Sequence, residues 1–406
     1  MNSPSALCHL PPAPRILIRG TNWLGDAVMT TPALLRLREK FPQAHIALLT
    51  PDKLRDLWAN HPAVDEIISF AAGESVFSVG KRLRRWGERP REPDLAHQNT
   101  AAAHEDARLT NFDLALVLPN SPRSAIETWL AGIPQRIGYA RPWRTFFLTQ
   151  TVAPRVGAVK MRKRSVAEIR QLVAVDGSQR PNSNSRVLPN AATNAHQIHE
   201  YLRLAAALGA DPELLAPQLF VTPDETESAK NKFGLEKFAQ PVFGLNPGAD
   251  YGPAKRWPVE RFIAAAKAIQ QRTNCIWLLF GGKNDAAITN RIESALRTPQ
   301  SATFNLAGKT CLSELMALLK LCRVLLTNDS GPMHVAAALG TPVVVPFGST
   351  SPELTGPGLP GDPRHCLLKS DAPCSPCFLR ECPIDFRCMN GISVERVVEA
   401  VLEFKL

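Results

Sequence analysis

One acidic side chain, Asp26, lies in a position where it could remove a proton from a substrate. Asp26 closes the segment Arg19–Asp26, which directly follows an apolar run and contains two glycines that allow close approach of a ligand. A carboxylate at a helix start can also cap free N–H groups, and this is the simplest interpretation. The alternative is a general base acting on a hydroxyl of the substrate. The substrate side of such a site would be lined by Thr21, Asn22, Trp23 and Gly25.

A second segment has the composition of a diphosphate site. The stretch 246–258 follows another apolar run and contains Gly248, Lys255 and Arg256 just before Pro258. Proline favours the first position of a helix, so the two cations lie at a helix start. Backbone N–H groups and two cations there could hold a diphosphate. The alternative is a solvated loop.

Two further turns between a strand and a helix could contribute to the same ligand. In the segment 327–334, the N–H groups at the helix start would face an anion. His334 could donate to that anion, but a lone histidine at such a position is more often structural. The candidate ligand-binding residues of this segment are Asp329, Ser330, Gly331 and His334. The turn 280–285, with Gly281, suits contacts to a base or ribose, or is an ordinary capped turn. The loop 19–26 is not a GxGxxG fingerprint, and GxxxxGK[ST] occurs nowhere in the sequence, which disfavours nicotinamide and P-loop chemistry.

The elements that must position these turns alternate between short apolar runs and longer amphipathic stretches, which is typical of βαβ units. Expected strands in the first half are 15–19, 45–50, 66–70, 112–118 and 136–139. Those in the second half are 242–246, 275–281, 303–306, 324–327 and 343–347. Expected helices include 33–40, 124–131, 199–208, 259–271, 285–296, 312–321 and 332–339. We therefore predict an α/β fold with two doubly wound parallel sheets in series.

The same pattern predicts the domain organisation. Residues 1–14 are expected to be a disordered leader, and 15–210 a first domain that carries a charged insertion at 71–111. A junction at 211–240 leads to a second domain, 241–406, with a Cys-rich loop at 373–388. The terminal helix 394–404 is expected to cross back onto the first domain.

Charge is distributed unevenly along the chain. The net charge is +10; residues 1–210 carry 27 Lys and Arg against 17 Asp and Glu, whereas residues 211–406 carry 20 of each. This excess favours an anionic partner for the first half, or is a solvated arginine-rich surface. Nucleic acid is disfavoured because the basic stretch 81–91 has one aromatic residue. No apolar run reaches the ~20 residues of a membrane-spanning helix, so we expect a cytoplasmic enzyme.

Four cysteines crowd into one short segment near the end of the sequence: Cys374, Cys377, Cys382 and Cys388. Four thiolates could form a structural zinc site, but the second pair lacks the C-x2-C spacing of zinc ribbons. A disulfide, a redox or iron–sulfur site, or unliganded buried thiols are the alternatives. The position after the expected phosphate-binding helix argues against a catalytic role.

The motifs together resemble glycosyltransferase family 9. The resemblance is carried by Gly25-Asp26 followed by Thr31–Leu34, by 247–249 with 252–257, and by the long segment 327–339. It extends from about Arg15 to the end of the chain. The sequence departs from the family pattern in the insertion 71–111 and around Asn182, so the acceptor side is the less well defined part.

The resemblance implies a GT-B fold, in which two Rossmann-like doubly wound domains face a cleft. It also implies an inverting heptosyltransferase of lipopolysaccharide biosynthesis. The donor would be ADP-L-glycero-D-manno-heptose on the second domain, and the acceptor heptosyl-Kdo-lipid A on the first. The enzyme would make a peripheral contact with the inner leaflet of the inner membrane and would not bind nucleic acid.

By the same resemblance, Asp26 is the catalytic base, Lys255 neutralises the leaving diphosphate, and Ser330, Gly331 and His334 bind phosphate oxygens. No cofactor is then required for catalysis. The alternatives are a family member with another nucleotide sugar or acceptor, and a nucleotide-binding protein without transferase activity.

Overall fold

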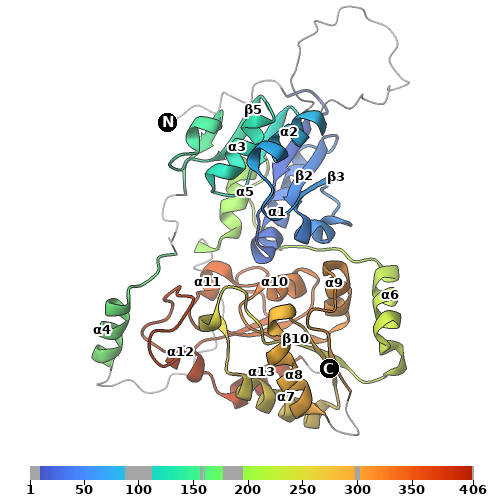
Figure 1. The fold of residues 1–406 in the computed structure, drawn as a ribbon, viewed down its shortest axis with the longest axis vertical. Helices are drawn as coiled ribbons and strands as arrows, with labels where there is room; N and C mark the ends of the chain where they lie inside the picture. Colours follow the sequence, from blue (N-terminus) through green and yellow to red (C-terminus); the bar gives the residue numbers. More distant parts are fainter. Residues whose placement is uncertain are drawn as a thin grey trace, which may run out of the picture. The chain divides into compact units, whose positions relative to one another are not determined.

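The computed structural model describes residues 10–86, 112–155, 159, 161–176, 195–297 and 302–404. Contacts divide the chain into two compact units (Figure 1). Unit 1 comprises residues 1–22, 33–156 and 200–213, and unit 2 comprises 23–32, 157–199 and 214–406. Each unit contains its own parallel sheet.

The sheet of unit 1 contains the strands β1 (Arg15–Arg19), β2 (His45–Pro51), β3 (Glu66–Phe70), β4 (Leu114–Val117), β5 (Gln135–Tyr139) and β6 (Gln150–Val152). They are parallel and lie in the order β3-β2-β1-β4-β5-β6. The direction of winding therefore changes between β1 and β4. In open sheets of this kind, ligands bind beyond the strand ends at such a switch point.

The helices of this first part of the chain are α1 (Leu24–Lys40), α2 (Val76–Trp86), α3 (Pro122–Leu130) and α5 (Ile198–Ala206), with 3-10 turns η1 (Asp52–Trp58) and η2 (Thr145–Phe147). Two residues of α2, Val79 and Leu83, pack into a core with Leu17 and Leu49 of the sheet. A fully buried ion pair joins Arg19 Nε at the end of β1 to Glu127 Oε2 of α3 at 2.8 Å. Burial of two charges is tolerated there because each compensates the other.

The sheet of unit 2 contains β7 (Val242–Asn246), β8 (Ile276–Leu279), β9 (Thr303–Asn305), β10 (Val324–Thr327), β11 (Val343–Pro346) and β12 (His365–Leu368). These strands are also parallel, in the order β12-β11-β10-β7-β8-β9. The switch point lies between β7 and β10. The turns after these two strands are the candidate anion-binding segments.

The helices of unit 2 are α4 (Val166–Asp176), α6 (Pro223–Phe233), α7 (Val259–Thr273), α8 (Ala286–Leu296), α9 (Leu312–Leu321), α10 (Gly331–Ala338), α11 (Pro352–Thr355), α12 (Arg387–Asn390) and α13 (Val394–Leu402). Short 3-10 turns are η4 (Leu235–Lys237), η5 (Pro253–Lys255) and η6 (Lys283–Asp285). Figure 1 shows α7, α8 and α13 lying together.

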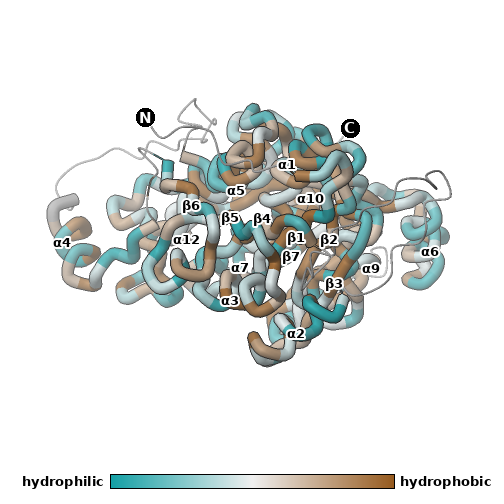
Figure 2. The backbone as a smooth tube through the Cα atoms, turned by 90° about the horizontal axis from the view of Figure 1, so that it is seen from above, coloured by the Kyte–Doolittle hydropathy of each residue, from teal (hydrophilic) through white to brown (hydrophobic). Residues whose placement is uncertain are grey.

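Alternating apolar residues explain this packing. Phe243 and Leu245 of β7 point to the core shared with α7, α8 and α13, because successive strand residues face opposite sides. The apolar strand β1 is brown in Figure 2, whereas the polar helix α6 is largely teal. Helix α6 begins with a capping box between Thr222 and Glu225 and ends at Gly234, whose φ of 66° suits glycine.

The two predicted doubly wound sheets are confirmed, with corrections to individual elements. Strands β6 and β12 were not predicted, because QTV is short and polar and HCLL lies in a Pro/Gly-rich region. Helix α1 begins at Leu24 and not at residue 33, so that Asp26 lies inside its first turn. The prediction that the terminal helix crosses back onto the first domain was wrong, since α13 packs on α7 in the core of unit 2.

The boundaries of the two units also differ from the expected domains. Residues 157–199 and 23–32 belong to unit 2 by their contacts, although the sequence places them in the first domain. The leader 1–9, most of the insertion after Trp86 and most of the loop 175–195 lie outside the described residues. None of the helices within the described ranges has the length and apolar character to span a membrane.

Candidate active site

The site in unit 2 is built from three chain segments that end or begin near the switch point. These are the turn after β7, the turn after β10 and the first turns of α1, which are part of unit 2. Thr31 of α1 is fixed there, because its Oγ1 accepts a hydrogen bond from the Gln218 N–H at 3.0 Å. The segments bring together four residues singled out from the sequence: the carboxylates Asp26 and Asp329, Lys255 and His334.

Asp26 is held by one amide and lies in an environment that favours its protonated form. The Nε2 of Gln197 donates to Asp26 Oδ1 at 3.4 Å. Burial raises the pKa of Asp26 to about 6, and Gln197 and the positive charge of Lys255 limit the rise. A carboxylate with a pKa near neutrality can accept a proton efficiently and can also release it, which is the property of a general base.

Lys255 ends η5 and forms an ion pair with a carboxylate from the turn after β10. Its Nζ lies 2.6 Å from Asp329 Oδ2, and both side chains are largely buried. The same Asp329 oxygen accepts a hydrogen bond from Thr350 Oγ1 at 2.6 Å. The Tyr251 ring supports the ammonium group, whose Nζ lies 5.0 Å from the ring centroid. A fixed, mostly desolvated cation therefore stands at the start of α10.

Asparagines join the turn after β7 to the turn after β10. Asn246 Nδ2 donates to the hydroxyl oxygens of Thr327 and Ser330, each at 3.0 Å. Asn328 accepts from the Trp257 N–H at 2.9 Å and donates to the Pro247 carbonyl at 2.7 Å. Ser330 stands at the N-cap position of α10, but its side chain does not cap the helix. The serine hydroxyl is thereby positioned beside a helix start that attracts anions.

His334 lies in the first turn of α10 and is buried. Burial lowers the pKa of His334 to about 4, so the imidazole is neutral at neutral pH and can donate one N–H. Its ring fills the space beside Gly25, where a Cβ would lie 2.7 Å from His334 Cδ2. A side chain at position 25 would therefore collide with the histidine, which is one reason for the glycine there.

Asp285 explains two further glycines of the sequence analysis. A Cβ on Gly248 would collide with the Asp285 carboxylate, and one on Gly281 would lie 2.9 Å from Asp285 Cβ. Asp285 accepts from the Gly282 N–H at 3.0 Å and pairs with Arg256, whose Nη2 lies 3.4 Å away. The carboxylate thus holds Arg256 and both glycine turns together.

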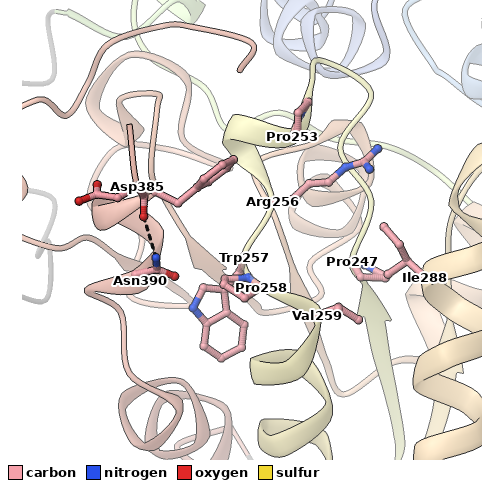
Figure 3. A pocket seen from close by; sticks show the side chains of 10 residues that line it. Pro247, Pro253, Arg256, Trp257, Pro258, Val259, Ile288, Asp385 and Asn390 are labelled. Carbon is pink, nitrogen blue, oxygen red and sulfur yellow. Dashed lines mark hydrogen bonds between the residues drawn. The ribbon is translucent and has the colours of Figure 1, made fainter. Parts of the chain in front are cut away.

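A pocket of about 450 Å³ adjoins the turn after β7 (Figure 3). Figure 3 shows Asp385 and Asn390 on one side of it and Pro247 and Ile288 on the other. Asn390 Nδ2 donates to the Asp385 carbonyl at 2.8 Å. Arg256 lines this pocket, but Lys255, Ser330 and His334 do not. The pocket is therefore separate from the polar cluster that contains Asp26.

The acceptor-side loop of the sequence analysis is divided between the units. Thr21 and Asn22 belong to unit 1, and Trp23 and Gly25 to unit 2. The Thr21 hydroxyl is buried without a hydrogen-bond partner in the structure. Asn22 Oδ1 accepts from Arg19 Nη1 at 3.0 Å, so the buried ion pair of Arg19 also fixes this loop.

The four clustered cysteines line one small cavity in unit 2. Burial and the other three thiols raise the pKa of Cys388 to about 12, and the Phe386 N–H donates to Cys382 Sγ at 3.4 Å. All four cysteines are free thiols in the structure. No group of three or more His, Cys, Asp or Glu side chains within the described ranges is arranged to hold a metal ion. A structural zinc ion stays a prediction.

Two Rossmann-like parallel sheets, one with a cationic helix start at its switch point, define the GT-B class of glycosyltransferases. The profile of glycosyltransferase family 9 (heptosyltransferase) matches residues 167–386. The chain is 34% identical to lipopolysaccharide heptosyltransferase 2 of Escherichia coli (strain K12), over 84% of this chain and 85% of that protein. The chain belongs to glycosyltransferase family 9.

Solved structures agree with this assignment. The structure of E. coli ADP-heptose LPS heptosyltransferase II matches with a TM-score of 0.68 at 28% identity, covering 96% of this chain and 98% of that chain. A glycosyl transferase family 9 protein from Veillonella parvula DSM 2008 has a TM-score of 0.70 at 21% identity, with 96% and 97% covered. The second match shows the fold alone.

Sequence reasoning missed three residues of this cluster. Gln197 follows a polar stretch without periodicity, so nothing in the sequence connects it to Asp26. Thr350 comes after β11 and gave no signal either. Asp285 lay within a segment already singled out, and an Asp next to two glycines could have been considered as a partner for Arg256.

Proposed function

We propose that this chain is an inverting glycosyltransferase that moves L-glycero-D-manno-heptose from ADP-heptose to heptosyl-Kdo-lipid A. The observation that carries the proposal is the 34% identity with a lipopolysaccharide heptosyltransferase 2 over most of both chains. The chain is also 33% identical to lipopolysaccharide heptosyltransferase 2 of Salmonella typhimurium and 30% identical to lipooligosaccharide heptosyltransferase 2 of Haemophilus influenzae. The polar cluster in unit 2 supplies the chemistry that such a transfer needs.

Asp26 is proposed as the general base. Its carboxylate takes the proton of an acceptor hydroxyl while that oxygen forms the new bond to the anomeric carbon of the donor. The bond from this carbon to the diphosphate oxygen breaks in the same displacement, which inverts the configuration. The pKa of about 6 keeps Asp26 mostly ionised at neutral pH and still basic enough to accept the proton.

The leaving ADP carries the electron pair of the broken bond and is proposed to be stabilised from the other side of the cluster. Lys255 supplies a fixed positive charge, and the start of α10 with Ser330 and His334 supplies hydrogen-bond donors. Asp329 holds Lys255 in place until the diphosphate competes for it. Arg256, Gly248 and Gly281 would form the nucleotide side of the site together with Asp285.

The lysine and the helix start would supply the positive charge that a divalent ion provides in many other transferases. We therefore propose that transfer requires no metal or other cofactor. Activity should survive treatment with a chelator and should not respond to added Mg²⁺. Loss of activity on chelation, restored by a divalent ion, would contradict this part of the proposal.

The acceptor is proposed to bind through unit 1, and the enzyme to act in the cytoplasm at the inner leaflet of the inner membrane. The support is the excess of basic residues in the first half, which suits a phosphorylated, lipid-linked acceptor. The basic residues are not proposed to bind nucleic acid.

A panel of donors tests the proposal. Purified enzyme is given a heptosylated Kdo-lipid A acceptor and either ADP-heptose, ADP-glucose or a UDP-sugar, and the released nucleotide is measured. We expect turnover with ADP-heptose only. Turnover with a UDP-sugar and none with ADP-heptose would favour a family member of other specificity. ADP binding without any turnover would favour a non-catalytic nucleotide-binding protein.

A further inference from the structure

The connection between β5 and β6 in unit 1 presents large aromatic side chains to solvent. Trp143 is 89% exposed and Phe146 is 84% exposed. The ring of Phe147 touches Phe146 and also Trp129 of α3, with centroids 5.4 Å apart in each pair. Contiguous exposed aromatic groups of this size mark an interaction site. We call residues 140–147 the aromatic–arginine loop.

Behind these aromatic groups lies a buried arginine with unused hydrogen-bonding capacity. The Arg144 side chain is fully buried, and its Nη1 donates to the Pro119 carbonyl at 2.6 Å and to Asn120 Oδ1 at 3.4 Å. Its Nε and Nη2 atoms have no hydrogen-bond partner. Burial and the charge of Arg141 lower the pKa of Arg144 to about 10, so it remains a cation at neutral pH. A buried cation with unpaired N–H groups is costly, and an anion would relieve that cost.

The arginines and the aromatic side chains of the loop line one pocket. A pocket of about 610 Å³ is lined by Arg141 and Arg144 together with Trp143, Phe146 and Phe147. Hydrogen bonds hold the loop in shape: Arg136 Nε donates to the Phe147 carbonyl at 2.7 Å, and Thr145 Oγ1 donates to the Arg141 carbonyl at 3.0 Å. The loop is therefore an ordered surface that combines apolar groups with two cations.

We propose that the aromatic–arginine loop binds the surface of an anionic lipid bilayer. Trp143 and Phe146 enter the boundary between headgroups and acyl chains, where aromatic residues are favoured. Arg141 binds phosphate oxygens of the headgroups, and the buried Arg144 adds positive charge behind it. The basic first half of the chain gives the long-range attraction to such a surface.

The inference extends the proposed function, because it places the enzyme on the membrane that carries the proposed acceptor. It does not depend on that function for its test, since lipid binding is measured without donor or transfer. A failure of lipid binding and a failure of heptose transfer are therefore distinguishable.

Sedimentation of the full-length protein with lipid vesicles tests the proposal. We expect binding to vesicles of phosphatidylcholine with phosphatidylglycerol, and much weaker binding to phosphatidylcholine alone. The double variant Trp143→Ala/Phe146→Ala should bind the anionic vesicles on the order of tenfold more weakly, because two apolar side chains no longer insert. Arg141→Gln should weaken binding about fivefold, since each cation near such a surface contributes roughly 1 kcal/mol.

Phe77→Ala is the matched control, because Phe77 of α2 is 70% exposed in the same unit but outside the loop. This variant should bind vesicles as the unchanged chain does, and all variants should unfold at the same temperature. Equal loss of binding in Phe77→Ala and in the double variant would overturn the assignment, and so would unchanged binding in the double variant. Two other results would also overturn it: a dimer that the double variant abolishes, and full competition by inorganic phosphate or by a polynucleotide.

Discussion

Replacing Asp26 by asparagine separates the two roles that a carboxylate at a helix start can have. The pKa of Asp26 in the folded chain is about 6, compared with 3.8 for an unperturbed aspartate. The folded pKa is therefore raised, so ionisation of this group costs stability as the pH rises from about 4 through 6. At ~1.4 kcal/mol per pKa unit, the cost reaches about 3 kcal/mol above pH 6.

Asp26→Asn removes this charge and keeps the shape of the side chain. We expect the variant to be more stable than the unchanged chain at pH 8, by up to about 3 kcal/mol, with the gain vanishing below about pH 4. Urea unfolding at several pH values measures this difference. Transfer should fall by about two to four powers of ten, the contribution of a positioned base. Calorimetry should show unchanged ADP binding.

The pH profile of the unchanged enzyme gives a second measurement of the same group. Because Asp26 must be ionised to accept a proton, kcat/KM should decrease below about pH 6 with unit slope. The acidic limb should be absent from the residual activity of Asp26→Asn. Asp56→Asn is the control, since Asp56 is an exposed aspartate of η1, outside the candidate site. It should leave both stability and transfer unchanged.

A capping role for Asp26 makes the opposite prediction. If the carboxylate mainly stabilises the start of α1, Asp26→Asn should lose about 0.3–1 kcal/mol at pH 8 instead of gaining stability. A loss of stability together with unchanged transfer would refute the role of Asp26 as a general base. Unchanged stability at every pH would show that burial does not perturb this carboxylate.

Three further changes test other parts of the structure. Lys255→Ala leaves Asp329 without its ion-pair partner and should weaken ADP binding about 10- to 100-fold, measured by calorimetry, with Lys255→Arg recovering part of it. Glu127→Ala leaves Arg19 buried without a carboxylate and should cost about 3–5 kcal/mol in urea unfolding; a cost near zero would contradict the buried pair. Metal analysis of protein purified without oxygen tests the structural zinc ion: one zinc ion per chain that is lost in Cys377→Ser would support it. Metal-free protein would exclude the predicted zinc site and leave the buried thiols as the alternative.

Much of the fold could be predicted because it depends on local patterns. The runs 15–19, 242–246 and 324–327 have apolar centres and are bounded by polar or turn residues, so their strands were placed with the correct ends. The edge strands β6 and β9 are less buried than the central strands, and the short polar sequence of β6 explains why it was missed. The edge strand β12 is buried at every position, so its place at the edge does not by itself explain why it was missed.

The sequence by itself determined the order of the elements and the family, because hydrophobic periodicity and contiguous motifs are properties of neighbouring residues. It also pointed to the turns after β7 and β10. The roles of single residues in those turns depend on groups that are distant along the chain. Gln197 is separated from Asp26 by 171 positions, and no local pattern connects them.

Only the tertiary structure decided which charges are desolvated and which are compensated. Burial raises the pKa of Asp26 and lowers that of His334, and burial has no signature in composition. Gly25 was interpreted as a site of close ligand approach, and the structure shows that His334 fills the space beside it; Asp285 fills the space beside Gly248 and Gly281. A glycine that admits a ligand and a glycine that makes room for a neighbouring side chain look the same in the sequence. Only the packing shows what occupies the place of the missing side chain.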